Sequence, residues 1–98
     1  MRPESSMIAR RYRIVGRVQG VGFRAFACDV AESLGVCGWV RNAADGSVEA
    51  QAEGDAETLA RFEEELRRGP RASRVEGVDG SDAESTGRLG FTVVHDAF

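Results

Sequence analysis

The chain has 98 residues, of which 42% are hydrophobic and 30% charged, and its formal net charge is −3. This length supports one small domain, and no apolar run approaches the roughly 20 residues needed to span a bilayer. All 13 basic residues are arginine, which excludes chemistry that needs a Schiff-base or nucleophilic lysine.

Residues 1–9 are interpreted as a flexible N-terminal tail, and residues 10–98 as a single domain. The tail lacks the apolar segment of a signal peptide, so we expect a cytoplasmic protein. The domain begins with a strand over residues 10–18, in which apolar residues alternate with arginines.

A helix is predicted from Phe23 to a stop at Gly35, because apolar residues recur there at helical spacing. Its apolar stripe is Phe23, Phe26, Val30 and Leu34. Residues 36–43 are typical of a strand, and Asp45-Gly46 indicates a hairpin turn. On the returning strand, apolar residues alternate from Val48 onward, and the residues expected to face solvent are Glu49, Gln51 and Glu53.

Asp55 is the predicted N-cap of a second helix, which ends at Gly69-Pro70 and has the apolar stripe Leu59, Phe62 and Leu66. The valines of residues 75–78 indicate a further strand. The polar stretch from Gly80 to Gly87 is predicted to be a turn or mobile loop, and a last short strand is expected from Phe91 to His95.

This order of elements, β-α-β-β-α-β with an additional short strand, predicts the α+β class. It is typical of a ferredoxin-like sandwich, in which two helices cover one face of an antiparallel sheet of four to five strands. In that arrangement the first and third strands lie at the centre of the sheet. The strand that ends at Asn42 should then lie beside the third strand.

The segment Gly16-Arg17-Val18-Gln19-Gly20-Val21-Gly22-Phe23-Arg24 joins the first strand to the first helix. Gly20 and Gly22 can adopt positive φ angles and have no Cβ, so several backbone N–H groups can converge at the positive end of the helix. Arg24 adds a planar set of donors that matches two phosphate oxygens. The segment therefore predicts a small phosphate-binding site.

Asn42 is the second candidate residue, because its predicted strand end should lie near this loop. A neutral amide can accept a hydrogen bond from water and donate one to a phosphate oxygen, so it can orient an attacking water. The residues by themselves equally support a simple polar residue before the Asp45-Gly46 turn, and both interpretations stay open.

No metal or cofactor is predicted. The only soft metal ligands are Cys28, Cys37 and His95, and their spacing matches no known metal motif. The two cysteines are expected to be free thiols rather than a disulfide. His95 is interpreted as a surface residue at the end of the last strand.

The segment from Gly16 to Arg24 resembles the signature of the acylphosphatase family, in which a Gly-x-Val-Gln-Gly-Val-x-Phe-Arg loop binds phosphate. The family's second signature is similar to Gly38-Trp39-Val40-Arg41-Asn42, followed by Asp45-Gly46, Val48-Glu49 and Gly54. The helix stop at Gly69-Pro70, with Ala72 and Val75, fits the same family. Together these motifs cover residues 12–95, which is nearly the whole chain.

The resemblance implies an enzyme that hydrolyses the carboxyl–phosphate bond of small acyl phosphates without a metal or cofactor. Arg24 would bind the phosphoryl group and Asn42 would position the attacking water. The substrate-binding loop would comprise Gln19, Gly20, Val21, Gly22, Phe23 and Arg24. Because the leaving carboxylate is a weak base, positioning and charge stabilisation would suffice, and the proton of the water would pass to the substrate's own phosphate.

Two other functions compete with this one. The same fold could serve as a non-catalytic module that binds anions or carbamoyl phosphate, as in the N-terminal part of larger hydrogenase-maturation proteins, but the cysteine-rich modules expected there do not occur before Phe98. RNA-recognition domains share the order of elements, but they stack bases on aromatic residues, which the third predicted strand lacks. The acidic part of the chain, residues 25–98, would also repel a polyanion. We therefore expect no nucleic-acid partner. We also expect no membrane partner and a monomer, although no sequence pattern addresses the oligomeric state.

Overall fold

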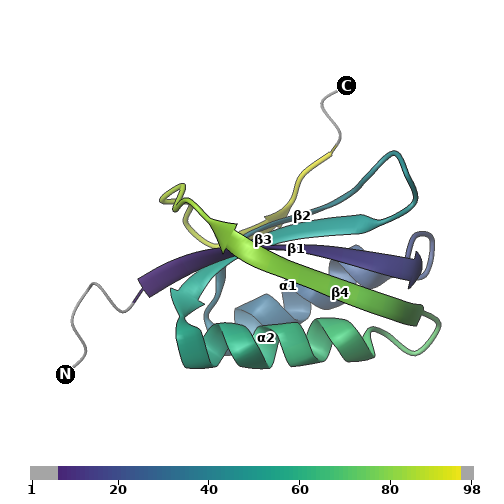
Figure 1. Ribbon diagram of the computed structural model, residues 1–98, viewed down its shortest axis with the longest axis horizontal. Helices are drawn as coiled ribbons and strands as arrows, with labels where there is room; N and C mark the ends of the chain where they lie inside the picture. Colours follow the sequence, from purple (N-terminus) through teal and green to yellow (C-terminus); the bar gives the residue numbers. More distant parts are fainter. Residues whose placement is uncertain (1–6, 96–98) are drawn as a thin grey trace.

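The computed structural model describes residues 7–95, which form two helices and a five-stranded sheet (Figure 1). The elements in chain order are β1 (Met7–Arg17), α1 (Phe23–Leu34), β2 (Cys37–Asn42), β3 (Val48–Asp55), α2 (Ala56–Arg68), β4 (Arg74–Ala83) and β5 (Phe91–Val93). Neither helix in this part of the chain has the length and apolar content needed to cross a bilayer.

The strands lie in the order β4-β1-β3-β2-β5, and both helices cover the same face of the sheet (Figure 1). The predicted ferredoxin-like α+β fold is therefore confirmed, with β1 and β3 at the centre. The prediction of a wholly antiparallel sheet is wrong at one edge, because β5 pairs with β2 in the parallel direction. After β4 the chain crosses to the opposite edge and enters β5 at the end of the sheet where β2 begins, which makes these two strands run the same way.

β1 begins three residues earlier than expected. Residues 7–9 pair with β3, and Ala9 is only 6% exposed between its neighbours on β3 and β4. The predicted tail over residues 1–9 is therefore wrong for residues 7–9, because backbone pairing extends the strand beyond its alternating apolar pattern. Residues 1–6 lie outside the described residues.

The hydrophobic core lies between the sheet and the two helices. α2 contributes the predicted stripe of Leu59, Phe62 and Leu66, all 2% exposed or less. The ring of Phe62 contacts those of Tyr12 and Phe91, at centroid distances of 5.8 and 5.7 Å. Asp55 caps the helix as predicted, because its Oδ1 accepts a hydrogen bond of 2.8 Å from the backbone N–H of Thr58.

The buried stripe of α1 differs from the predicted one. Its fully buried residues are Phe23, Ala27 and Ala31, whereas Phe26, Val30 and Leu34 of the predicted stripe are only half-buried. The two alanines have small side chains, which lets the helix axis lie close to the sheet. Helical spacing of large apolar residues could not reveal this choice of face.

After β4 the chain runs towards β5. The first part of this connection, residues 84–87, lies over the face of the sheet opposite the helices and is called the strap below. The side-chain amide of Gln51 donates a hydrogen bond of 2.9 Å to the carbonyl oxygen of Glu84. The carboxylate of Glu53 accepts hydrogen bonds from Ser85 and Thr86. The strap therefore anchors on two β3 side chains.

Because of the strap, Gln51 and Glu53 are buried, with exposed fractions of 3% and 8%, and the prediction that they face solvent is wrong. The prediction of a loop from Gly80 to Gly87 is wrong in its first half, because residues 80–83 complete β4. Neither the burial of Gln51 and Glu53 nor the end of β4 could be predicted from polar composition, since polar side chains can be buried when their hydrogen bonds are satisfied.

Candidate active site

The loop between β1 and α1 is held at both ends by buried side chains. Val18 is 1% exposed where the loop begins, and Phe23 is 2% exposed where α1 begins. Between them Gly20 and Gly22 adopt φ angles of +74° and +81°, a conformation that side chains disfavour. The loop is thus compact, and Arg24 follows it directly in the first turn of the helix.

The N-terminus of α1 is left open by the residues around it. Gly22 is the N-cap residue and provides no side-chain hydrogen bond, and the first turn has no acidic residue. In α2, by contrast, Asp55 caps the helix and Glu57 lies in its first turn. The first N–H groups of a helix lack intrahelical acceptors and carry positive potential, so the start of α1 is suited to an anion.

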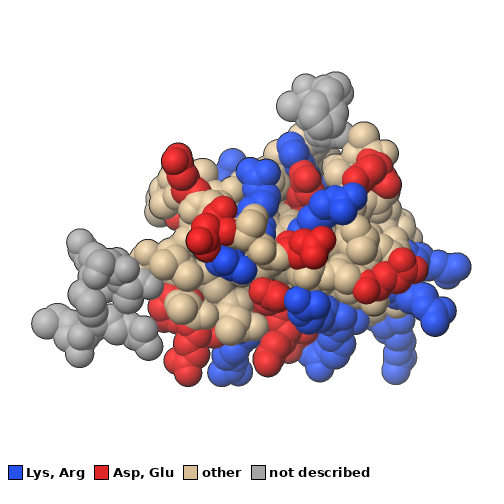
Figure 2. Space-filling view, in the orientation of Figure 1, with Lys and Arg blue, Asp and Glu red and all other residues tan. Residues whose placement is uncertain are grey.

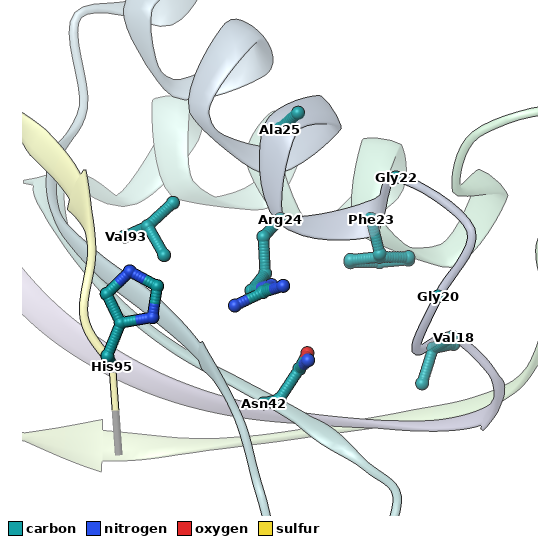
Figure 3. A pocket seen from close by; sticks show the side chains of 9 residues that line it. All are labelled: Val18, Gly20, Gly22, Phe23, Arg24, Ala25, Asn42, Val93 and His95. Carbon is teal, nitrogen blue, oxygen red and sulfur yellow. The ribbon is translucent and has the colours of Figure 1, made fainter. Parts of the chain in front are cut away.

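A cavity of about 400 Å³ opens at this helix end. Figure 3 shows the side chain of Arg24 in the middle of the cavity, with the amide of Asn42 pointing towards it from the sheet. Arg24 is half-buried as a residue, and within residues 7–95 its guanidinium takes part in no hydrogen bond or ion pair. The cavity is lined by Val18, Gly20, Gly22, Phe23, Arg24, Ala25, Asn42, Val93 and His95.

Asn42 reaches the cavity because it is the last residue of β2. It lies two residues after the buried Val40, so its side chain projects from the face of the sheet that carries the helices. The sequence separates Asn42 from Arg24 by a helix, a turn and a strand, and the fold brings both side chains to one cavity.

Gln19 connects the loop to the β2–β3 hairpin. Its side-chain amide donates hydrogen bonds to the carbonyl oxygens of Ala43 and Ser47, at 2.8 and 2.9 Å. Ala43 directly follows Asn42, so this pair of hydrogen bonds ties the β1–α1 loop to the strand end that carries the amide. The contact restricts how the two halves of the cavity can move relative to each other.

The hairpin itself is held by Asp45. Its carboxylate accepts hydrogen bonds from the hydroxyl and backbone N–H of Ser47, at 2.6 and 2.9 Å, and from the guanidinium of Arg13 at 2.5 Å. The hydrogen bond from the hydroxyl of Ser47 is the largest cause that keeps the pKa of Asp45 well below its usual range, and the hydrogen bond from Arg13 is the next. The carboxylate therefore stays ionised at neutral pH and holds the hairpin closed.

Arginine side chains gather at the end of the molecule where β4 begins, the same end that carries the β1–α1 loop (Figures 1 and 2). Elsewhere on the face shown in Figure 2, acidic and basic residues are interspersed. A local excess of positive charge attracts small anions towards the loop.

The predicted site residues divide into two groups. Gly20, Gly22, Phe23, Arg24 and Asn42 line the cavity. The side chains of Gln19 and Val21 lie elsewhere: Gln19 binds the hairpin, and Val21 packs against the core.

The cavity also contains residues outside the predicted site residues, namely Val18, Ala25, Val93 and His95. The last two follow from the parallel pairing of β5 with β2, which no local pattern indicates. Cys28 and Cys37 are half-buried free thiols away from this cavity. Within residues 7–95, no group of three or more His, Cys, Asp or Glu side chains is arranged to hold a metal ion.

The fold defines a ferredoxin-like α+β domain, and its cavity joins a glycine loop, an uncapped helix start and an arginine. The profile of the acylphosphatase family matches residues 10–93. The chain is 51% identical over 83 residues to an acylphosphatase of Synechococcus sp. (strain RCC307), which covers 85% of this chain and 71% of that protein. It is 48% identical to an acylphosphatase of Azoarcus sp. (strain BH72) over 91% of each chain.

A solved structure of the acylphosphatase from Bacillus subtilis superimposes with a TM-score of 0.85 at 38% sequence identity, covering 89% of this chain and 98% of that chain. The chain belongs to the acylphosphatase family.

Proposed function

We propose that this protein hydrolyses the carboxyl–phosphate bond of small acyl phosphates at the cavity between the β1–α1 loop and the end of β2. Acyl-phosphate hydrolysis follows from its membership of the acylphosphatase family. Arg24 and the backbone amides of residues 19–24 hold the phosphoryl oxygens, and Asn42 positions the water. One observation supports these roles above all: Arg24 and Asn42, far apart in sequence, line the same cavity.

In this reaction the water oxygen forms a bond to phosphorus while the bond between phosphorus and the acyl oxygen breaks. The acyl oxygen keeps the electron pair and leaves as a carboxylate, and both protons of the water end on the phosphate product. Because a carboxylate is a weak base, its departure needs no strong general acid. The protein contributes position and charge, as is usual for phosphoryl transfer.

Arg24 is suited to this role by its place in the fold. A cation at the positive end of a helix is electrostatically unfavourable, and among residues 7–95 no carboxylate offsets it at this position. A bound phosphoryl group would offset both the arginine and the helix end at once. Removing one preorganised donor of this kind costs roughly 2.7–4 kcal/mol of transition-state stabilisation, or about 10²–10³ in rate.

The test is the release of phosphate from benzoyl phosphate, without added metal, by the wild type and the variants Arg24→Ala and Asn42→Ala. We expect activity in the wild type and a loss of about 10²-fold or more in each variant, with circular dichroism showing that both variants fold. Arg61→Ala is a matched control, because Arg61 is an exposed arginine of α2 outside the cavity. It should keep full activity.

A folded wild type without activity would overturn hydrolysis and leave an anion-binding module, which equilibrium binding of inorganic phosphate would then detect. Near-normal turnover by Arg24→Ala or Asn42→Ala would overturn the role proposed for that residue.

A further inference from the structure

His95 lies just beyond the part of the chain that matches the family profile, residues 10–93. It nevertheless lines the same cavity as Arg24 and Asn42. Figure 3 shows its imidazole ring turned towards the side chain of Arg24, next to Val93. The cavity therefore contains an imidazole side chain that lies outside the residues matched by the family profile.

The position of His95 follows from the pairing of β5 with β2. Gly38 pairs with Phe91 and Val40 with Val93 in the parallel register. The backbone N–H of Val94 donates a hydrogen bond of 2.9 Å to the carbonyl oxygen of Val40, which keeps the chain alongside β2 past the end of β5. Continuing the register by two residues brings His95 beside Asn42, on the face of the sheet that carries the helices.

The two sides of Arg24 differ in chemistry. In Figure 3 the loop with Gly20 and Gly22 lies on one side of the Arg24 side chain, and Val93 and His95 lie on the other. If the phosphoryl group occupies the loop side, the acyl group of the substrate extends towards the methyl groups of Val93 and the imidazole of His95. In Figure 3, Val93 and His95 line the cavity on this side of Arg24, next to β2.

The imidazole is available for a ligand. His95 is exposed, and within residues 7–95 its ring takes part in no hydrogen bond or ion pair. A neutral imidazole donates one N–H and an imidazolium donates two. Because Arg24 would be engaged by the phosphoryl group, His95 is the donor left for an acceptor on the acyl group.

We propose that His95 is a specificity-determining residue that binds the acyl group of the substrate. It favours acyl phosphates whose acyl group carries a free carboxylate. The proposal rests on the hydrolysis proposed above. Val93 contacts the hydrocarbon part of the acyl group, and His95 donates a hydrogen bond to its carboxylate. A hydrogen bond to a charged group is strong enough to change relative substrate preference by about tenfold.

The experiment compares two substrates that differ only at the far end of the acyl group, benzoyl phosphate and 4-carboxybenzoyl phosphate. The ratio of their kcat/KM values is measured for the wild type, His95→Ala and His95→Gln, together with the inhibition constant of inorganic phosphate. Thr92→Ala is the matched control, because Thr92 is an exposed β5 residue outside the cavity.

We expect His95→Ala to lower the preference for the carboxylated substrate about tenfold while the inhibition constant of phosphate stays within twofold of the wild-type value. His95→Gln keeps an N–H donor and should retain most of the preference, and Thr92→Ala should not change it. An unchanged ratio in an active His95→Ala enzyme would overturn the proposal, as would an equal weakening of both substrates and of phosphate. A wild type that hydrolyses neither substrate would instead overturn the proposed hydrolysis, and this proposal with it.

Discussion

The side-chain amide of Gln19 donates a hydrogen bond of 2.8 Å to the carbonyl oxygen of Ala43, the residue that follows Asn42. A second hydrogen bond of 2.9 Å runs from the same amide to the carbonyl oxygen of Ser47. One side chain thus joins the β1–α1 loop to both ends of the turn between β2 and β3. We therefore expect Gln19 to be a positioning residue, because its hydrogen bonds set the distance between the loop and Asn42.

Gln19→Met should lower both stability and activity. Methionine has a similar volume but donates no hydrogen bond, and the two lost bonds correspond to about 1–2 kcal/mol in the free energy of unfolding. The loop and Asn42 should then be less well aligned, so kcat for benzoyl phosphate should fall while the enzyme remains folded. Urea unfolding and steady-state kinetics measure the two effects.

Gln51→Met is the control for this prediction. Gln51 also donates from its amide to a backbone carbonyl, that of Glu84, but it lies in the strap contact on the other face of the sheet. We expect it to lose stability similarly and to keep its kcat. Equal kcat values for Gln19→Met and Gln51→Met would contradict the positioning role.

Gly38→Ala should strongly destabilise the protein. A Cβ at this position would lie 1.8 Å from the carbonyl oxygen of Gln51 on the neighbouring strand, and the φ angle of +145° is unfavourable for alanine. β2 and β3 would have to separate, so we expect a loss of at least about 3 kcal/mol in the free energy of unfolding.

Gly87→Ala provides the comparison, because Gly87 also has a positive φ, +69°, but a Cβ there meets nothing within 4 Å. It should cost only about 1–2 kcal/mol from backbone strain. Thermal unfolding followed by circular dichroism measures both variants, and equal melting temperatures would refute the steric argument for Gly38.

The free energy of unfolding should depend on pH, because the carboxylate of Glu53 accepts the hydrogen bonds that hold the strap. Burial by itself would raise the pKa of this carboxyl, but hydrogen bonds from Ser85 and Thr86 outweigh burial and lower the pKa below its ordinary value. A carboxyl whose pKa is lower in the folded state stabilises the protein above its ordinary pKa of about 4.3. That contribution is lost as the pH falls through the lowered value.

We therefore expect Glu53→Gln to be less stable than the wild type at pH 7 by about 1–3 kcal/mol. The difference should narrow as the pH falls below the ordinary pKa of a glutamate and through the lowered pKa of Glu53, because the wild-type carboxylate then takes up a proton. Urea unfolding from pH 7 to pH 3 measures it, with the exposed Glu64→Gln as control. A difference independent of pH would show that the charge of Glu53 does not hold the strap.

The thiol of Cys28 should react slowly with disulfide reagents. Burial raises its pKa, and the negative charges of Asp29 and Glu32 raise it further. Less thiolate is then present at pH 8, and the thiolate is the reactive form. In a Cys37→Ser variant, which leaves Cys28 as the only thiol, the reaction should be several-fold slower than that of a cysteine in a short peptide. Asp29→Asn in the same background should accelerate it, and an unchanged rate would contradict the electrostatic part of the explanation.

Several features of the protein could be predicted from local sequence. The stripe of Leu59, Phe62 and Leu66, the Asp55 cap and the turn at Asp45-Gly46 each depend on residues within one or two turns of chain. The loop from Gly16 to Arg24 was recognisable for the same reason. Such patterns encode backbone angles and the buried face of an element, which near neighbours largely determine.

The face of α1 was harder to predict. Large apolar residues pointed to a stripe through Phe26, yet the helix buries Ala27 and Ala31. The preference for small residues arises from the space between the helix and the sheet, which the helix sequence does not contain. A hydrophobic pattern therefore located the helix correctly but not its contact.

Local sequence patterns were enough to predict the order of the elements and the residues that could bind a phosphoryl group. Which of these residues meet depends on the packing of distant segments, which places Asn42 opposite Arg24, buries Glu53 under the strap and brings His95 to the cavity. Each of these outcomes depends on a connection between strands that are not neighbours in the sheet: β1 to β2 for Asn42, and β4 to β5 for Glu53 and His95. Long-range pairing of this kind is stabilised by contacts between distant segments, so no local pattern can specify it.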